Sequence, residues 1–113
     1  MDFTQAQHVS DRSSLKLVKS GAGTVTTSAF GGAGSTQSTA TIPHGLGTDE
    51  LIFQVGVKWD GQYYMAPFQS PGGQVLVYPS LDGTNLYVTA ETNSAGGGQP
   101  QTTFEYYYRL LVP

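Results

Sequence analysis

The chain has 113 residues, of which 38% are hydrophobic and only 12% are charged, with a net charge of −3 and no cysteine. This length suits one domain with a small core, and the missing thiols exclude disulfides and thiolate chemistry. The five Lys and Arg residues are scattered, which argues against nucleic-acid binding through a basic patch. No apolar run approaches the roughly 18 residues that a membrane span needs, so membrane insertion is not expected.

The first third of the chain gives weak signals. Residues 1–13 are polar and without periodicity, and are predicted to form an N-terminal arm before a single domain over residues 14–113. A short strand is predicted over residues 15–19. Residues 20–37 lack any charged side chain and are dense in Gly, Ala, Ser and Thr. They are interpreted either as Thr-rich strands joined by a glycine turn or as a flexible linker, and the sequence does not decide between them.

A half-buried strand over residues 51–59 is the clearest element of the chain. Its large apolar side chains fall on one face at a period of two. The Asp60-Gly61 pair that follows is typical of a type I′ hairpin, with a return strand over residues 62–66. Trp59 and Met65 are expected to belong to the core.

The second half repeats the pattern of short strands and Gly/Pro turns. A turn at residues 71–73 precedes a strand at 75–78, and a hairpin with Asp82-Gly83 at its tip leads into a strand at 86–90. A glycine-rich loop at 93–100 precedes the last strand, at 102–112. No segment shows a helical stripe. The predicted fold is therefore all-β, an antiparallel sandwich of about six to eight short strands, lectin-like or jelly-roll-like.

The tyrosines suggest a binding surface. Neighbouring tyrosines of a strand cannot share a face, so Tyr107 and one of Tyr63 and Tyr64 should leave the face that their neighbours occupy. Exposed rings beside Gln, Asn and Asp could stack on sugar faces while amides hydrogen-bond the hydroxyls. The same rings could instead fill a subunit interface, which the low charge and the modest core slightly favour. The candidate receptor-binding residues are Tyr63, Tyr64, Asp82, Asn85 and Tyr107. The predicted binding loops are 60–61, 67–74, 79–85 and 92–101.

Catalytic and metal-binding patterns are weak. The chain has two histidines, His8 and His44, which is too few for a metal site within one protomer. His44 would become a ligand only if three copies met on a threefold axis, and is otherwise expected to hydrogen-bond the backbone of its turn. No nucleophile elbow occurs. A pair of carboxylates could assemble from Asp60, Asp82, Glu91 and Glu105, but turn chemistry already explains the two aspartates. We therefore expect no enzymatic activity and no cofactor.

The segment Ile42-Pro43-His44-Gly45-Leu46-Gly47 is read as a rigid structural turn, because Pro43 fixes its own φ while Gly45 and Gly47 permit positive φ. Together with the strand that follows, over residues 38–59, it resembles a pattern found near the C-terminal ends of bacteriophage tail-fibre and minor tail proteins. The resemblance implies a non-enzymatic virion protein, assembled in the host cytoplasm, whose tail-fibre or tail-tip domain attaches to a host-surface glycan or protein. It also implies a homo-oligomer, most simply a trimer, in contact with other virion subunits.

Two other functions remain open at this point. The chain could be a capsid decoration or head–tail accessory protein that staples other subunits and binds no receptor. It could also be a free carbohydrate-binding module, monomeric and carrying one exposed aromatic platform.

Overall fold

The fold is built from strands and turns alone within residues 15–112, which are the residues that the computed structural model describes; the predicted arm at 1–13 lies outside them. The strands, in chain order, are β1 (Lys16–Thr27), β2 (Gly34–Pro43), β3 (Ile52–Trp59), β4 (Gln62–Met65), β5 (Phe68–Gln69), β6 (Val75–Leu81), β7 (Asn85–Ser94) and β8 (Thr102–Val112).

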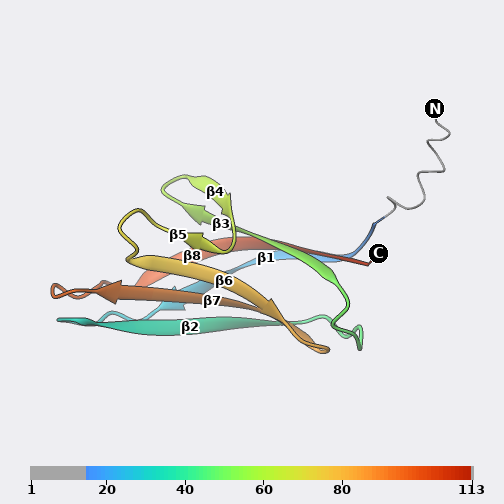
Figure 1. Cartoon of the computed structure of the whole chain (residues 1–113), viewed down its shortest axis with the longest axis horizontal. Coiled ribbons are helices and arrows are strands. Elements are labelled where there is room, and N and C mark those ends of the chain that lie inside the picture. Colours follow the sequence, from blue (N-terminus) through green and yellow to red (C-terminus); the bar gives the residue numbers. More distant parts are fainter. Residues whose placement is uncertain (1–14, 113) are drawn as a thin grey trace.

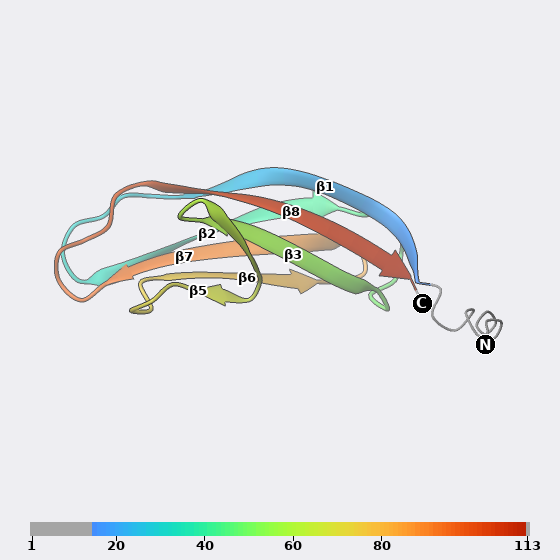
Figure 2. The ribbon, with the colours of Figure 1, turned by 90° about the horizontal axis from the view of Figure 1, so that it is seen from above.

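The strands form two antiparallel sheets that pack face to face. One four-stranded sheet has the order β1-β8-β3-β4, and the other has the order β2-β7-β6-β5 (Figures 1 and 2). β1 pairs with β8 and β2 pairs with β7, so the first strands join the last ones, as in a jelly roll. The middle of the chain instead forms local hairpins, β3–β4 and β6–β7. The predicted β-sandwich is confirmed, and its last strand is a central strand of its sheet.

The ambiguous region at 20–37 is mostly strand, so the linker interpretation is wrong. Its glycines are explained by the tyrosines of the neighbouring strand β8, because Gly21 lies opposite Tyr108 and Gly23 lies opposite Tyr106. A methyl group on Gly21 would stand 2.6 Å from the Tyr108 hydroxyl, and one on Gly23 would stand 2.7 Å from the Tyr106 hydroxyl. Both rings therefore lie across β1, and glycine provides the space they need.

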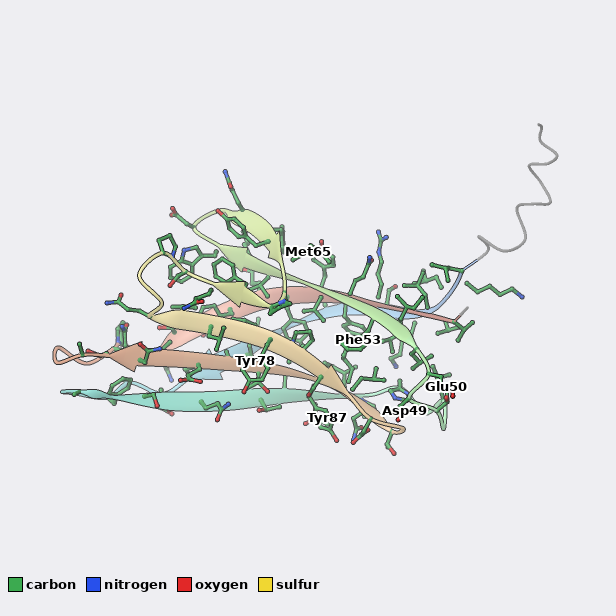
Figure 3. All side chains as sticks on the ribbon, in the orientation of Figure 1. Asp49, Glu50, Phe53, Met65, Tyr78 and Tyr87 are labelled. Atoms are coloured by element: carbon green, nitrogen blue, oxygen red, sulfur yellow. The ribbon has the colours of Figure 1, made fainter. Side chains whose placement is uncertain are left out.

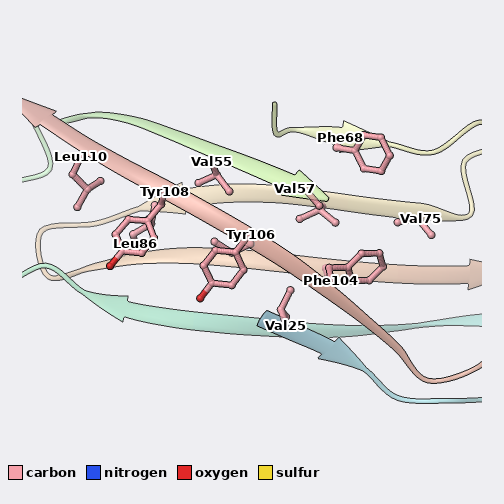
Figure 4. Close-up of a cluster of buried hydrophobic side chains, with 13 residues drawn as sticks. Val25, Val55, Val57, Phe68, Val75, Leu86, Phe104, Tyr106, Tyr108 and Leu110 are labelled. Atoms are coloured by element: carbon pink, nitrogen blue, oxygen red, sulfur yellow. The ribbon is translucent and has the colours of Figure 1, made fainter. Parts of the chain in front are cut away.

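The core lies between the two sheets and is small and aliphatic-aromatic. Figure 4 shows side chains of β3 and β8 directed into this space, among them Val55, Val57 and Phe104. Val55, Val57 and Leu110 are fully buried, as the period-two patterns of β3 and β8 predicted. β7 closes the core from the other sheet with Leu86, Val88 and Ala90.

Met65 is not a core residue, contrary to the prediction. The Asp60-Gly61 hairpin, with φ of 52° and 82°, sets a register in which Gly56 faces Met65 and Val57 faces Tyr64. Because Val57 points into the core, Met65 points to the outer face and is 52% exposed. Trp59 is half-buried and packs against the core cluster.

Candidate functional site

An open groove lies where the chain passes from the edge of one sheet to the edge of the other. Strand β4 ends at Met65, and a cis Ala66–Pro67 peptide leads into β5, which pairs with β6. The groove has a volume of about 750 Å³. Its walls are the β3–β4 hairpin and the loop that follows β5, with the lining residues Trp59, Asp60, Tyr64, Met65, Pro67, Phe68, Gln69, Ser70, Pro71, Gly72 and Gly73.

Three aromatic rings form one wall of this groove. Tyr64 stacks on Phe68 with ring centroids 4.9 Å apart and an angle of 26° between the planes. The ring centroid of Trp59 lies 6.1 Å from that of Phe68 and 6.1 Å from that of the core residue Phe104. Phe68 is buried, whereas Tyr64 remains 40% exposed. The exposed tyrosine is therefore anchored through a buried ring to the core, which holds it in one position.

The opposite wall is a loop held by its own hydrogen bonds. The Ser70 amide donates to the Val75 carbonyl (2.9 Å), and the Val75 amide donates to the Ser70 hydroxyl (3.1 Å). The Asn93 side-chain amide donates to the Gly73 carbonyl (3.0 Å), which ties this loop to β7. The loop is thus fixed before any ligand arrives, which lowers the entropic cost of binding.

Two polar side chains of the groove remain available to a ligand. Within residues 15–112, neither the Asp60 carboxylate nor the Gln69 amide makes a side-chain hydrogen bond, and both residues are exposed. Apolar rings combined with a few unengaged polar groups are the usual composition of a small-molecule site. The groove can therefore offer stacking surface, one carboxylate and one amide to the same ligand.

The predicted binding tyrosines separate onto two faces. Tyr63 is 53% exposed on the outer face of its sheet, where its ring meets Tyr107 edge-on with centroids 5.2 Å apart. Lys58 reaches over the Tyr63 ring at 5.9 Å and lies 4.0 Å from Glu105. Tyr64 alone of the three lines the groove.

Asp82 and Asn85 lie in the β6–β7 hairpin, at the end of the fold opposite to the β3–β4 hairpin tip (Figure 1). The Asp82 carboxylate accepts hydrogen bonds from the backbone amide of Asn85 (2.7 Å), the backbone amide of Thr84 (2.9 Å) and the Tyr87 hydroxyl (2.7 Å). These bonds, led by the one from Asn85, lower the pKa of Asp82. Asp82 therefore has a full set of partners within its own hairpin, and the structure does not bring it to the groove.

His44 joins its own turn to the same hairpin. The Leu46 amide donates to Nδ1 of His44 (3.0 Å), so Nε2 carries the proton and donates to the Asp82 carbonyl (2.9 Å). The His44 amide donates to the Thr84 carbonyl (2.9 Å), and Gly45 has a φ of 66°. Figure 3 shows Tyr87, Asp49 and Glu50 at the same end of the fold.

Both ring nitrogens of His44 thus have a hydrogen-bond partner, Nδ1 within the turn at residues 43–47 and Nε2 in the β6–β7 hairpin. An axial metal site would have to break one of these hydrogen bonds. Within the described residues, no group of three or more His, Cys, Asp and Glu side chains could hold a metal ion.

The four carboxylates considered as a catalytic pair occupy separate places. Asp60 lines the groove and Asp82 lies in the far hairpin. Glu91 stands in β7, opposite Gln37 of β2, and Glu105 lies beside Lys58 in the other sheet.

Trp59, Phe68 and Gln69 were missing from the predicted site residues. The loops 60–61 and 67–74 were predicted to bind a ligand. The aromatic wall itself could not be predicted, because it depends on which aromatic side chains face the groove after the chain crosses from one sheet to the other. The available signal was the run of aromatics on both sides of Asp60-Gly61 and Pro67.

Comparison with protein families, with curated proteins and with solved structures finds no match for this chain. No helix in the described part of the chain is long and apolar enough to cross a membrane.

Proposed function

We propose that this protein is a non-catalytic attachment module that binds a saccharide in the groove between β4 and the loop after β5. The observation that carries the proposal is the Tyr64–Phe68 stack, with Trp59 beside it and the free Asp60 and Gln69 side chains within the same groove. The C–H face of a sugar ring is apolar and its hydroxyl rim is polar, so a flat ring beside unengaged carboxylate and amide groups matches both.

We further propose that the module serves a bacteriophage as a tail-fibre or tail-tip domain. The support is the turn pattern at residues 42–47, joined to a β-sandwich that has a glycan-sized groove at one sheet edge. The low charge and the Ser/Thr-rich surface of β1 and β2 suit a particle protein that works outside cells.

The adjacent tyrosines give a matched test of the groove. Tyr64→Ala removes the exposed half of the aromatic wall, whereas Tyr63→Ala removes a ring of similar exposure from the opposite face of the same strand. With a panel of bacterial surface oligosaccharides, calorimetry should show binding by the native chain and by the Tyr63→Ala variant. The Tyr64→Ala variant should bind at least roughly tenfold more weakly, as expected for loss of a central aromatic anchor. Equal losses in both variants would contradict the proposal.

A second candidate function, as a capsid or head–tail accessory protein, is favoured by an apolar group where β1 begins and β8 ends. Leu17, Leu111 and Ile52 stand in one row across β1, β8 and β3, and Leu17 and Ile52 are 56% and 41% exposed. Such a group suits burial against another virion subunit. The Leu17→Asp/Ile52→Asp chain should then fail to be incorporated when particles assemble in its presence. The same variant should still bind sugar. Full incorporation would count against this candidate.

A further inference from the structure

The free edges of the two sheets differ in how they are protected. An edge strand exposes unpaired backbone groups, and natural proteins protect such edges by short length, lysines or bulges. β4 has four residues and β5 has two. β1 carries Lys16 and Lys19 and has a bulge between Leu17 and Lys19. Three of the four edges therefore have a recognised form of protection.

The fourth edge, β2, has none of these features. It runs for ten residues in unbroken register with β7, contains no charged side chain, and has its one proline at the last position. Within residues 15–112 no strand pairs with its other edge, and Figure 1 shows β2 as the lower margin of the fold. The side chains Ser35, Gln37, Thr39 and Thr41 are exposed along it. A long, regular and uncharged edge of this kind is suited to pairing with another strand.

We infer that β2 pairs with β2 of a second copy of this chain, antiparallel and about a twofold axis. In such a pair each β2 residue faces a β2 residue of the second copy, so charges of a single sign on β2 would face each other, and β2 carries no charged side chain. Pairing about the middle of the strand places Ser35 opposite Thr41 of the second copy, and Gln37 opposite Thr39. The Ser35–Thr41 pair has a hydroxyl on each side, and such pairs stabilise antiparallel strands.

The contact would join the β2-β7-β6-β5 sheets of both copies into one continuous sheet. β5, beside the groove, is at the opposite edge of this sheet from β2, so both grooves would stay open at the two far ends. A dimer would then hold two grooves at once and gain avidity on a repetitive glycan. This last consequence rests on the proposed function, but the dimer itself does not. A twofold contact also differs from the threefold assembly that the sequence resemblance implies.

Charge placed at facing positions tests this geometry directly. The Ser35→Lys/Thr41→Lys chain would set lysine against lysine twice in the dimer, and the Ser35→Lys/Thr41→Glu chain would set lysine against glutamate twice. The Ser80→Lys/Gln101→Lys chain adds the same charge at exposed positions away from β2. Circular dichroism would verify that every variant is folded, and sedimentation equilibrium would give the dimer dissociation constant.

We expect a native dimer, a loss of on the order of tenfold or more in affinity for the double-lysine chain, and native-like affinity for the lysine–glutamate and control chains. A native chain that is monomeric at all concentrations, or trimeric, would overturn the inference. So would a double-lysine chain that dimerises as well as the control. Sugar binding by the groove can be measured on each variant, so failure of the dimer and failure of the proposed function are distinguishable.

Discussion

The contact between Tyr107 and Gly56 offers a sharp test of the packing on the outer face of the β1-β8-β3-β4 sheet. Gly56 of β3 lies opposite Tyr107 of β8, and the Tyr107 ring covers it so closely that a methyl group on Gly56 would overlap the ring carbons. Gly56→Ala therefore has to displace the ring, which also ends its edge-on contact with Tyr63 at 5.2 Å.

The expected change in the free energy of unfolding caused by Gly56→Ala is a sum of opposing terms. Overpacking costs roughly 1–3 kcal/mol, and losing the contact between the two tyrosine rings adds on the order of 0.5–1.5 kcal/mol. Replacing glycine by alanine in a strand interior by itself stabilises the fold by roughly 0.5–1 kcal/mol. The Gly56→Ala chain should therefore be less stable by about 2 kcal/mol. In a Tyr107→Ala background the overlap is gone, and the same substitution should stabilise by roughly 0.5–1 kcal/mol.

Urea unfolding followed by the fluorescence of Trp59, the one tryptophan of the chain, gives all four corners of this double-mutant cycle. Gly83→Ala is a matched control, because nothing lies within 4 Å of a methyl group at that position. The sign reversal is the central result. If Gly56→Ala is equally destabilising with and without the Tyr107 ring, the packing argument is refuted.

Three further predictions concern the polar network and the buried tyrosines. His44→Ala should lower the free energy of unfolding by roughly 1–3 kcal/mol, because it removes two ring hydrogen bonds from a buried site; a change in urea midpoint near zero would exclude a structural role. Hydrogen bonds from Asn85, Tyr87 and Thr84 lower the pKa of Asp82 below its ordinary 3.8, so the stability they add is present above that pH and lost as pH falls through the lowered value. The difference in unfolding free energy between the native and Asp82→Asn chains should accordingly shrink as the pH is lowered below 3.8. A difference that stays constant with pH would be inconsistent with a lowered pKa of Asp82. Burial, and then the neighbouring Tyr108, raise the pKa of Tyr106 above 10.0, so this tyrosine ionises at lower pH in the unfolded chain and stability falls as pH rises past 10.0. In thermal unfolding at alkaline pH, the Tyr106→Phe chain should therefore lose less stability than the native chain. An unchanged loss would assign the alkaline destabilisation to other groups.

Regular alternation made the central strands predictable. The apolar positions of β3 and β8 repeat every second residue over at least eight residues, so their inward faces could be assigned from the sequence. The Asp60-Gly61 turn was predictable for the same local reason, since positive φ at both positions is typical of these two residues in sequence.

The first strand could not be predicted with the same certainty, because its stability depends on distant partners. Gly21 and Gly23 weaken a strand by their intrinsic propensity, and only the Tyr108 and Tyr106 rings from the other end of the chain explain their presence. Met65 was expected in the core, whereas the hairpin register directs it outward.

The candidate site was predictable as a set of loops but not as a surface. Tyr63 and Tyr64 are adjacent residues of the same type, and only the face that each occupies decides that Tyr64 lines the groove and Tyr63 does not. The Tyr64–Phe68 stack joins strands of two different sheets, which requires the path of the chain through Ala66–Pro67. A period-two pattern contains no information about such a change of sheet.

The most direct test of the saccharide-binding proposal uses Trp59 as a reporter within the groove itself. Its fluorescence would be recorded while bacterial surface oligosaccharides are added to the native chain and to the Tyr64→Ala chain. Binding in the groove predicts a saturable change in intensity or wavelength for the native chain, and little or no change for the variant. A native chain that binds these oligosaccharides by calorimetry while Trp59 fluorescence remains constant would place the sugar elsewhere and contradict the proposed site.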